Sequence, residues 1–179
     1  RTQVSHGSSG LIRLGFPDLS GEPLEQLRLQ LLDYYSQNLC AGTTLFEGCQ
    51  AVLDALDARA MRWGIVTNKP GFLTTPLLAT LGLDRHAGCV ISGDTLPQRK
   101  PHPAPLLLAA AQLSLPAQQC LYVGDAERDV QSARAAGMPV LVARYGYLGP
   151  ADDSHSWQPD AQIDAPPQIL HWLDGVTFS

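Results

Sequence analysis

From residue 63 onward, short apolar runs alternate with longer stretches in which apolar residues recur at helical spacing. The short runs are typical of buried strands, and they cover residues 63–66, 89–92, 120–123 and 139–143. The longer stretches predict helices at residues 49–56, 75–81, 105–113, 127–136 and 168–173. This alternation predicts an α/β fold, with a mainly parallel sheet and helices on both of its faces.

The segment before residue 43 has a different pattern. Leucines and tyrosines recur at helical spacing over residues 24–35 and form one apolar stripe, and residues 4–14 are a shorter, glycine-punctuated helical candidate. We therefore expect residues 1–43 to form a helical appendage and residues 44–179 to form the sheet domain. After residue 146 the chain is rich in Pro and Asp, which predicts mostly loop before the final helix.

The amino-acid composition limits the size of the domain and the kinds of molecule that the protein can bind. With 179 residues and 45% hydrophobic content, the chain has room for one α/β domain and a modest appendage. A net charge of -5 argues against nucleic acid as a partner, because phosphate-backbone binding relies on clustered cations. No apolar run approaches the ~18 residues of a membrane span. The four cysteines form no C-x-x-C pair, and buried thiols in a reducing cytoplasm are the simplest account.

The strongest candidate chemistry follows the third predicted strand. The apolar run ends at Gly124 and delivers Asp125 at its carboxyl end, where parallel sheets bind ligands, and Asp129 follows one helical turn later. Carboxylate oxygens are the ligands that Mg²⁺ prefers, and this ion keeps water and substrate phosphate in its other positions. The alternative is structural: Asp125 caps the helix and Asp129 pairs with a neighbouring arginine.

Two further candidates involve hydroxyl and ammonium groups. Thr67 and Asn68 follow the first predicted strand, where a hydroxyl and neighbouring backbone N–H groups make a small phosphate cradle, although an ordinary helix cap also explains them. The only two lysines, Lys69 and Lys100, both precede proline. A compact ammonium suits an anion site, whereas two exposed turns are the simpler explanation for the lysines alone.

In this chain order, the candidates resemble the haloacid dehalogenase superfamily of phosphohydrolases. The resemblance covers about residues 45–147. Its most specific parts are similar to the phosphoglycolate phosphatase and N-acetylmuramic acid 6-phosphate phosphatase group: Val-Thr-Asn-Lys-Pro at 66–70, Lys-Pro-His-Pro at 100–103, Gly-Asp-Ala-Glu-Arg-Asp at 124–129 and Arg-Tyr-Gly-Tyr at 144–147. The resemblance implies a Rossmann-like sheet, with residues 1–43 as the remainder of a helical cap.

The resemblance also implies catalytic roles. Thr67 would bind the phosphoryl group, Lys100 would stabilise that group and the nucleophile, Asp125 would ligate Mg²⁺, and Asp129 would support the water shell of the metal. The implied reaction is hydrolysis of a small phosphate monoester through an aspartyl-phosphate.

The sequence leaves the substrate's identity and the oligomeric state open. Asn68 and Lys69 are the candidates for substrate contact. In the appendage, Ser5, His6 and Arg13 are placed to meet the organic part of a phosphorylated metabolite, but a Gly- and Ser-rich helix start explains them equally well.

The nucleophile that the resemblance requires is absent from this sequence. It is the first Asp of an Asp-x-Asp-x-Thr run, on a strand lying between those that end at Thr67 and Gly124. Without that strand, two buried edges would lie ~10 Å apart. Buried unpaired backbone groups cost on the order of 1 to 3 kcal/mol each. We therefore expect this sequence to be part of a longer protein and to be inactive alone.

Two other functions stay open from the sequence. One is a non-catalytic remnant that binds a phosphorylated ligand or a partner protein, which predicts that residues 1–179 unfold cooperatively in a melt. The other is phosphoryl transfer within the superfamily, as in a sugar-phosphate mutase, which predicts an isomerised product instead of released phosphate.

Overall fold

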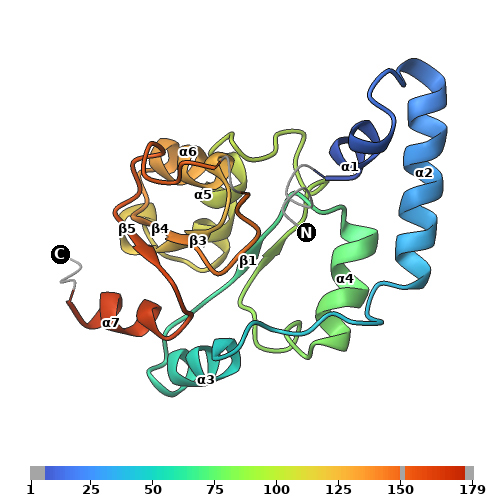
Figure 1. Cartoon of the computed structure of the whole chain (residues 1–179). Helices are drawn as coiled ribbons and strands as arrows, with labels where there is room; N and C mark the ends of the chain where they lie inside the picture. The colour runs from blue at the N-terminus through green and yellow to red at the C-terminus, as the bar shows by residue number, and fades with distance from the viewer. Residues whose placement is uncertain (1–6, 150–151, 176–179) are drawn as a thin grey trace.

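The computed structural model describes residues 7–149 and 152–175, and their helices and strands alternate as the sequence pattern predicts (Figure 1). The helices are α1 (Gly7–Gly15), α2 (Gly21–Gln37), α3 (Cys49–Ala58), α4 (Gly71–Thr80), α5 (Ala104–Gln112), α6 (Glu127–Ala136) and α7 (Gln168–Gly175), with a 3₁₀ turn, η2, at Ala117–Gln119. The strands are β1 (Ile65–Val66), β2 (Val90–Ile91), β3 (Tyr122–Gly124), β4 (Val140–Ala143) and β5 (Ala161–Ile163). All strand pairs are parallel, so the predicted α/β class is confirmed.

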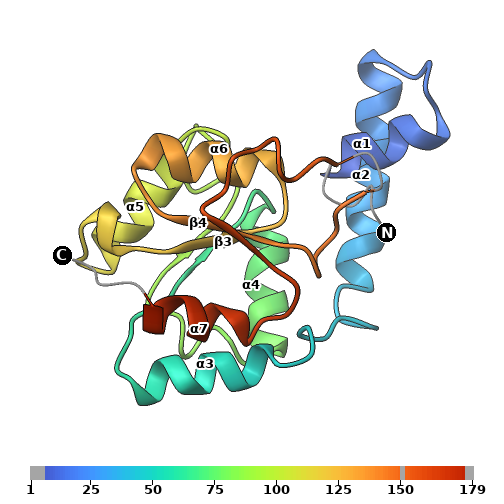
Figure 2. The same ribbon diagram turned by 60° about the vertical axis from the view of Figure 1, so that its left-hand side comes forward.

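The described strands form two separate sheets instead of one. β1 pairs with β2, and β3, β4 and β5 pair in that order. A cavity of about 660 Å³ lies between the two sheets and is lined by residues of both β1 and β3. The helices cover both faces: Figure 2 shows α5 and α6 on one side of β3 and β4, and α3 and α7 on the other. The sheet layer is therefore interrupted between two helical layers.

The buried residues form two clusters that follow this division. The larger cluster combines α6 and β4 with Leu106 and Ala110 of α5. The smaller one consists of Cys89, Ile91 and Ala109, which brings together β2 and the other side of α5. Because α5 contributes to both clusters, it joins the two sheets on one face.

The appendage consists of α1 and α2, which lie side by side away from the sheets in both ribbon views. The apolar stripe that the sequence predicts on α2 is not a buried face: no residue of this helix is buried, and Tyr34 is 67% exposed. Arg13 is exposed on α1. Ser5 and His6 lie outside the described residues.

Three local predictions differ from the structure. α4 begins at Gly71, four residues before the expected start, and continues through Pro76. β5 occupies part of the tail that was expected to be loop. Of the four free cysteines, only Cys89 is buried and the others are half-buried, so the expectation of buried thiols is wrong for three of them.

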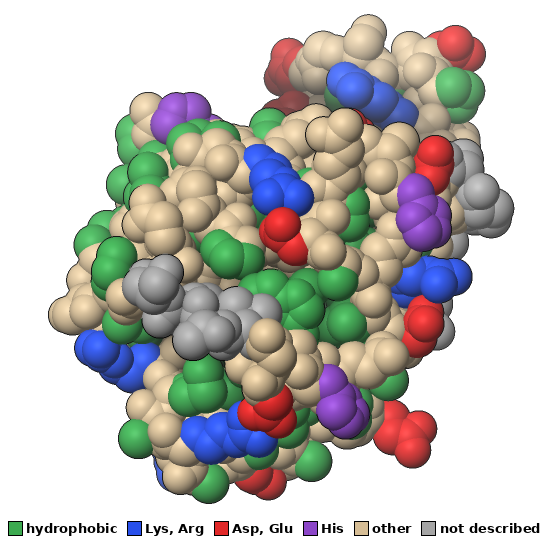
Figure 3. Space-filling view, turned by 90° about the vertical axis from the view of Figure 1, so that its left-hand side faces the viewer, with side chains coloured by type: hydrophobic (Ala, Val, Ile, Leu, Met, Phe, Trp, Pro, Cys, Tyr) green, Lys and Arg blue, Asp and Glu red, His purple; other side chains and the backbone are tan. Residues whose placement is uncertain are grey.

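Surface charge is mixed on the face where the described chain ends. Figure 3 shows Lys and Arg side chains scattered among Asp and Glu side chains there, with hydrophobic side chains gathered near the centre of the face. Within residues 7–149 and 152–175, no helix is long and apolar enough to cross a membrane.

Candidate active site

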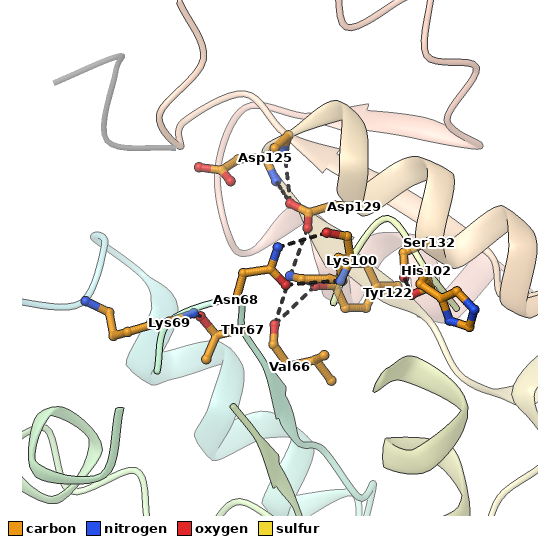
Figure 4. Close-up of polar contacts among 11 residues, drawn as sticks. Val66, Thr67, Asn68, Lys69, Lys100, His102, Tyr122, Asp125, Asp129 and Ser132 are labelled. Atoms are coloured by element: carbon orange, nitrogen blue, oxygen red, sulfur yellow. Dashed lines mark hydrogen bonds and ion pairs between the residues drawn. The ribbon is translucent and has the colours of Figure 1, made fainter. Parts of the chain in front are cut away.

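Lys100 occupies the centre of the site, between Val66 at the carboxyl end of β1 and Tyr122 of β3. Its side chain is 8% exposed, and its ammonium nitrogen lies 2.8 Å from Oδ1 of Asp129. The ammonium also donates to the hydroxyl of Tyr122 at 2.6 Å and to the carbonyl of Val66 at 3.0 Å. Three oxygens on two strands and one helix therefore fix the position of this charge (Figure 4).

These neighbours keep Lys100 charged. Burial by itself lowers the pKa of Lys100, but the adjacent Tyr122 and Asp129 raise it, and the pKa lies above its ordinary value overall. Burial raises the pKa of Tyr122. The phenol accordingly keeps its proton and donates it to the carbonyl of Val66, at 3.3 Å, while its oxygen accepts from the ammonium.

Asn68 positions Lys100 through the backbone. The side-chain amide of Asn68 donates to the carbonyl of Lys100 at 2.9 Å and accepts from its backbone N–H at 3.1 Å. The structure therefore shows Asn68 as a two-point clamp on the lysine loop, and its predicted contact with substrate stays a prediction. Thr67 lies beside it and accepts the N–H of Lys69 at 3.1 Å, so neither side chain caps α4.

The two aspartates have different surroundings. Asp129 is buried, and its Oδ2 accepts the backbone N–H groups of Asp125 and Ala126 at 3.2 and 3.1 Å. Asp125 is half-buried, and its Oδ2 accepts the N–H of Tyr147 at 2.8 Å. Figure 4 shows the two carboxylates pointing in different directions. The alternative in which Asp125 caps the helix and Asp129 pairs with an arginine is therefore wrong in detail. Asp129 itself caps the helix, and its partner is Lys100.

Two glycines make room for these carboxylates. A Cβ on Gly124 would lie 2.5 Å from Cβ of Asp129, and a Cβ on Gly146 would lie 2.5 Å from Cβ of Asp125. Real Cβ atoms do not approach so closely, so any larger residue at either place would push an aspartate aside. Gly146 belongs to the Arg-Tyr-Gly-Tyr run of residues 144–147, which the sequence singled out without assigning a role to it.

Lys69 lies apart from this centre and points toward the appendage. Its ammonium donates to the hydroxyl of Tyr35 on α2 at 2.8 Å and lies 4.5 Å from the centre of that ring. The structure thus separates the two lysines: Lys100 lies inside the core site and Lys69 lies at the contact between core and appendage.

Sequence reasoning missed two residues that hold the lysine loop. Tyr122 was taken only as part of an apolar strand, yet its hydroxyl binds Lys100. Ser132 on α6 is fully buried and donates to the carbonyl of His102 at 2.9 Å. For Tyr122 the available signal was a hydroxyl placed inside an otherwise apolar strand, where a buried polar group needs a partner.

The carboxylate oxygens of the site fit one small, hard cation. Within the described residues, no group of three or more His, Cys, Asp and Glu side chains is placed to hold a metal ion. Mg²⁺ does not require such a group, because it takes one or two carboxylates and keeps water or phosphate oxygens elsewhere. The half-buried carboxylate of Asp125, held by the N–H of Tyr147, is suited to that role.

These features define a Rossmann-like α/β enzyme domain with a buried ion pair and polar side chains gathered near the carboxyl ends of its parallel strands. The chain belongs to the haloacid dehalogenase-like hydrolase family, whose profile matches residues 17–143.

Named relatives agree with this assignment. The chain is 43% identical over 169 residues to a phosphoglycolate phosphatase of Xanthomonas campestris, covering 94% of this chain and 76% of the relative. It is 34% identical over 177 residues to an N-acetylmuramic acid 6-phosphate phosphatase of Pseudomonas putida, and the match covers 98% of this chain and 79% of that relative. A crystal structure of a predicted phosphoglycolate phosphatase from Haemophilus somnus superposes with a TM-score of 0.79 at 32% identity, covering 87% of this chain and 68% of the other.

Proposed function

We propose that the protein hydrolyses a small phosphate monoester in a Mg²⁺-dependent reaction. The observation that carries the proposal is the buried ammonium of Lys100, ion-paired with Asp129 at the strand ends where Thr67 and Asp125 also lie. Asp129 balances the buried charge, and the fixed position of the ammonium favours a phosphoryl group whose charge changes during reaction. The names of the relatives make 2-phosphoglycolate and N-acetylmuramic acid 6-phosphate the substrates to test first.

Each side chain then has a defined task. Thr67 binds a phosphoryl oxygen, Lys100 neutralises the phosphoryl group and the attacking carboxylate, and Asp125 holds Mg²⁺ with Asp129 supporting its water shell. When bound, Mg²⁺ supplies positive charge against the phosphate oxygens. The nucleophile is an aspartate outside this sequence: its oxygen bonds to phosphorus as the ester P–O bond breaks and the alcohol leaves. Water then breaks the aspartyl-phosphate and releases phosphate.

The appendage contributes to substrate selection in this proposal. Residues 1–43 are the remainder of a cap over the core domain at residues 44–179, and Lys69 lies where the two meet, bound to Tyr35. Both test substrates carry a carboxylate besides the phosphate, and in this proposal the ammonium of Lys69 at this boundary binds it. The proposed location of the enzyme is the cytoplasm.

The test compares variants of the complete enzyme for phosphate release. Lys100→Ala removes a charge that contributes roughly 4 kcal/mol at ~4 Å from a unit negative charge, so we expect turnover to fall by about 10³-fold. Asp125→Asn should abolish the response to added Mg²⁺. Arg99→Ala and Glu127→Gln change exposed neighbours of these residues and should leave turnover unchanged. Near-normal phosphate release from Lys100→Ala or Asp125→Asn would refute the proposal, and an isomerised product without free phosphate would indicate a mutase.

A further inference from the structure

The turn at residues 144–147 contacts Asp125 in two ways. The N–H of Tyr147 donates to Oδ2 of Asp125 at 2.8 Å. Gly146 lies so close to the carboxylate that a Cβ there would be 2.6 Å from the same oxygen. The N–H of Gly146 donates to the carbonyl of Ala143 at 3.0 Å, which ties the turn to the end of β4. The position of the Asp125 carboxylate therefore depends on the conformation of this turn.

The ring of Phe46 packs against both tyrosines of this turn. It meets the ring of Tyr145 edge to face, with the ring centroids 5.3 Å apart, and its centroid lies 5.9 Å from that of Tyr147. Both spacings fall in the range that aromatic pairs prefer, and such pairs attract beyond the burial of their area. The two tyrosines flank Gly146 in the sequence, so a single ring holds the turn on both sides of the residue that touches Asp125.

Phe46 ends the linker that joins the appendage to the core. This linker, residues 38–46, leads from α2 toward α3 (Figure 1), and its residues 41–44 are exposed. The carbonyl of Phe46 accepts the N–H of Cys49, the first residue of α3, at 3.0 Å. A cavity of about 340 Å³ is lined by residues 42–46 and Tyr147, so this part of the linker is not close-packed against the turn. The ring of Phe46 is therefore the contact that joins the linker to the turn beside Asp125.

We propose that Phe46 is a positioning residue for the Asp125 carboxylate and acts through the turn at residues 144–147. Its ring restricts the turn to the conformation in which Tyr147 donates to Asp125, and this keeps the carboxylate oriented for Mg²⁺. A site whose binding-competent conformation is populated for only a fraction of the time has its affinity reduced by that fraction, so loss of the ring weakens Mg²⁺ binding. The effect on Mg²⁺ rests on the proposed function, whereas the effect on the turn rests on the contacts alone.

The test uses Phe46→Leu in the complete enzyme, because leucine keeps apolar volume at this half-buried position and lacks the ring. Calorimetric titration should show Mg²⁺ binding about tenfold weaker, which corresponds to about 1.4 kcal/mol. Phe46→Tyr keeps the ring and should bind Mg²⁺ like the parent enzyme. Phe72→Leu removes a ring that is 57% exposed on α4 and should leave the affinity unchanged. Parental Mg²⁺ affinity in Phe46→Leu would overturn the inference.

Hydrogen exchange without metal measures the hold of the ring on the turn. In Phe46→Leu the amide of Tyr147 should exchange about tenfold faster, because it opens from Asp125 more often. The amide of Tyr122 donates to the carbonyl of Pro139 at 2.9 Å, should keep its rate, and is the internal control. An unchanged rate at Tyr147 would overturn the inference. Equal acceleration at both amides would also overturn it, because it would indicate a general loss of stability.

Steady-state kinetics separate positioning from a direct role in the reaction. At saturating Mg²⁺, Phe46→Leu should regain the parental kcat, because mass action repopulates the competent conformation, and its KM for the phosphate ester should be unchanged. A kcat that stays low at saturating Mg²⁺ would overturn the inference.

Asp125→Asn distinguishes this failure from failure of the proposed function. If Asp125→Asn binds Mg²⁺ as tightly as the parent enzyme, Asp125 is not the metal ligand, and both the proposed function and the positioning role of Phe46 are refuted. If Asp125→Asn loses Mg²⁺ binding while Phe46→Leu keeps it, only the positioning role is refuted.

Discussion

The ion pair between Lys100 and Asp129 can be tested by Asp129→Asn. The amide keeps an oxygen for the N–H groups of Asp125 and Ala126, but its NH2 group then faces Lys100, so the substitution removes both the negative charge and one acceptor of the ammonium. At 2.8 Å the Coulomb attraction is about 6 kcal/mol at an effective dielectric of 20. Tyr122 still accepts from the ammonium and offsets part of this loss. We therefore expect the free energy of unfolding to fall by about 3 kcal/mol, as when one partner of a buried pair is removed.

A second pair in the chain provides the matched control. Arg59 and Asp174 are 2.7 Å apart, but their side chains are 40% and 61% exposed, so Asp174→Asn should cost no more than about 1 kcal/mol. Urea unfolding followed by circular dichroism measures both changes. Because the chain has two lysines, selective labelling of their side chains also gives two NMR titrations. Asp129→Asn should lower the pKa of Lys100. Equal costs for the two variants, or an unchanged Lys100 titration, would refute the reasoning.

Two further predictions concern tyrosine ionisation and Gly146. Burial raises the pKa of Tyr122, and that of Tyr145 to about 12, so the folded state disfavours both phenolates. Stability should be intact below pH ~10 and fall as the pH rises toward 12; ultraviolet titration with all phenolate signal appearing together near pH 10 would contradict this. Gly146→Ala should weaken Mg²⁺ binding about tenfold or more by displacing Asp125, a change equivalent to about 1.4 kcal/mol in calorimetry. Gly42→Ala, with open space around it, is the control, and unchanged binding by Gly146→Ala would contradict the cradle.

The helices and strands were largely predictable because their signals are local. α6 spans the predicted residues 127–136, and it ends at Gly137 with a positive φ of 72°, a backbone conformation that glycine adopts at low cost. β5 was missed because its three residues include only one strongly apolar side chain, Ile163, which gives no periodic signal. The apolar stripe of α2 was visible, but periodicity identifies a face and does not show what covers it.

The site was predictable to the extent that its residues follow strands. Thr67 and Asp125 were candidates because each directly follows a predicted strand, and the carboxyl ends of parallel strands converge. Lys100 was a candidate because it precedes Pro101 and because of the family resemblance. The clamp from Asn68 to Lys100 was not predictable from the sequence, since it joins residues 32 positions apart and depends on how two loops pack. For the same reason, the hydroxyl of Tyr122 gave no sign of its contact with Lys100.

The interruption between β1 and β3 also bears on how the chain folds. β1, α4 and β2 form one contiguous β-α-β unit, and β3, α6 and β4 form another, each with its own parallel pairing. Without direct pairing between β1 and β3, cooperativity between the units passes through the helix α5, which contributes to both buried clusters, and through Lys100, which binds Val66 of β1 and Tyr122 of β3. The two units can therefore open as separate foldons, and a strand placed between them would couple them into a single folding transition.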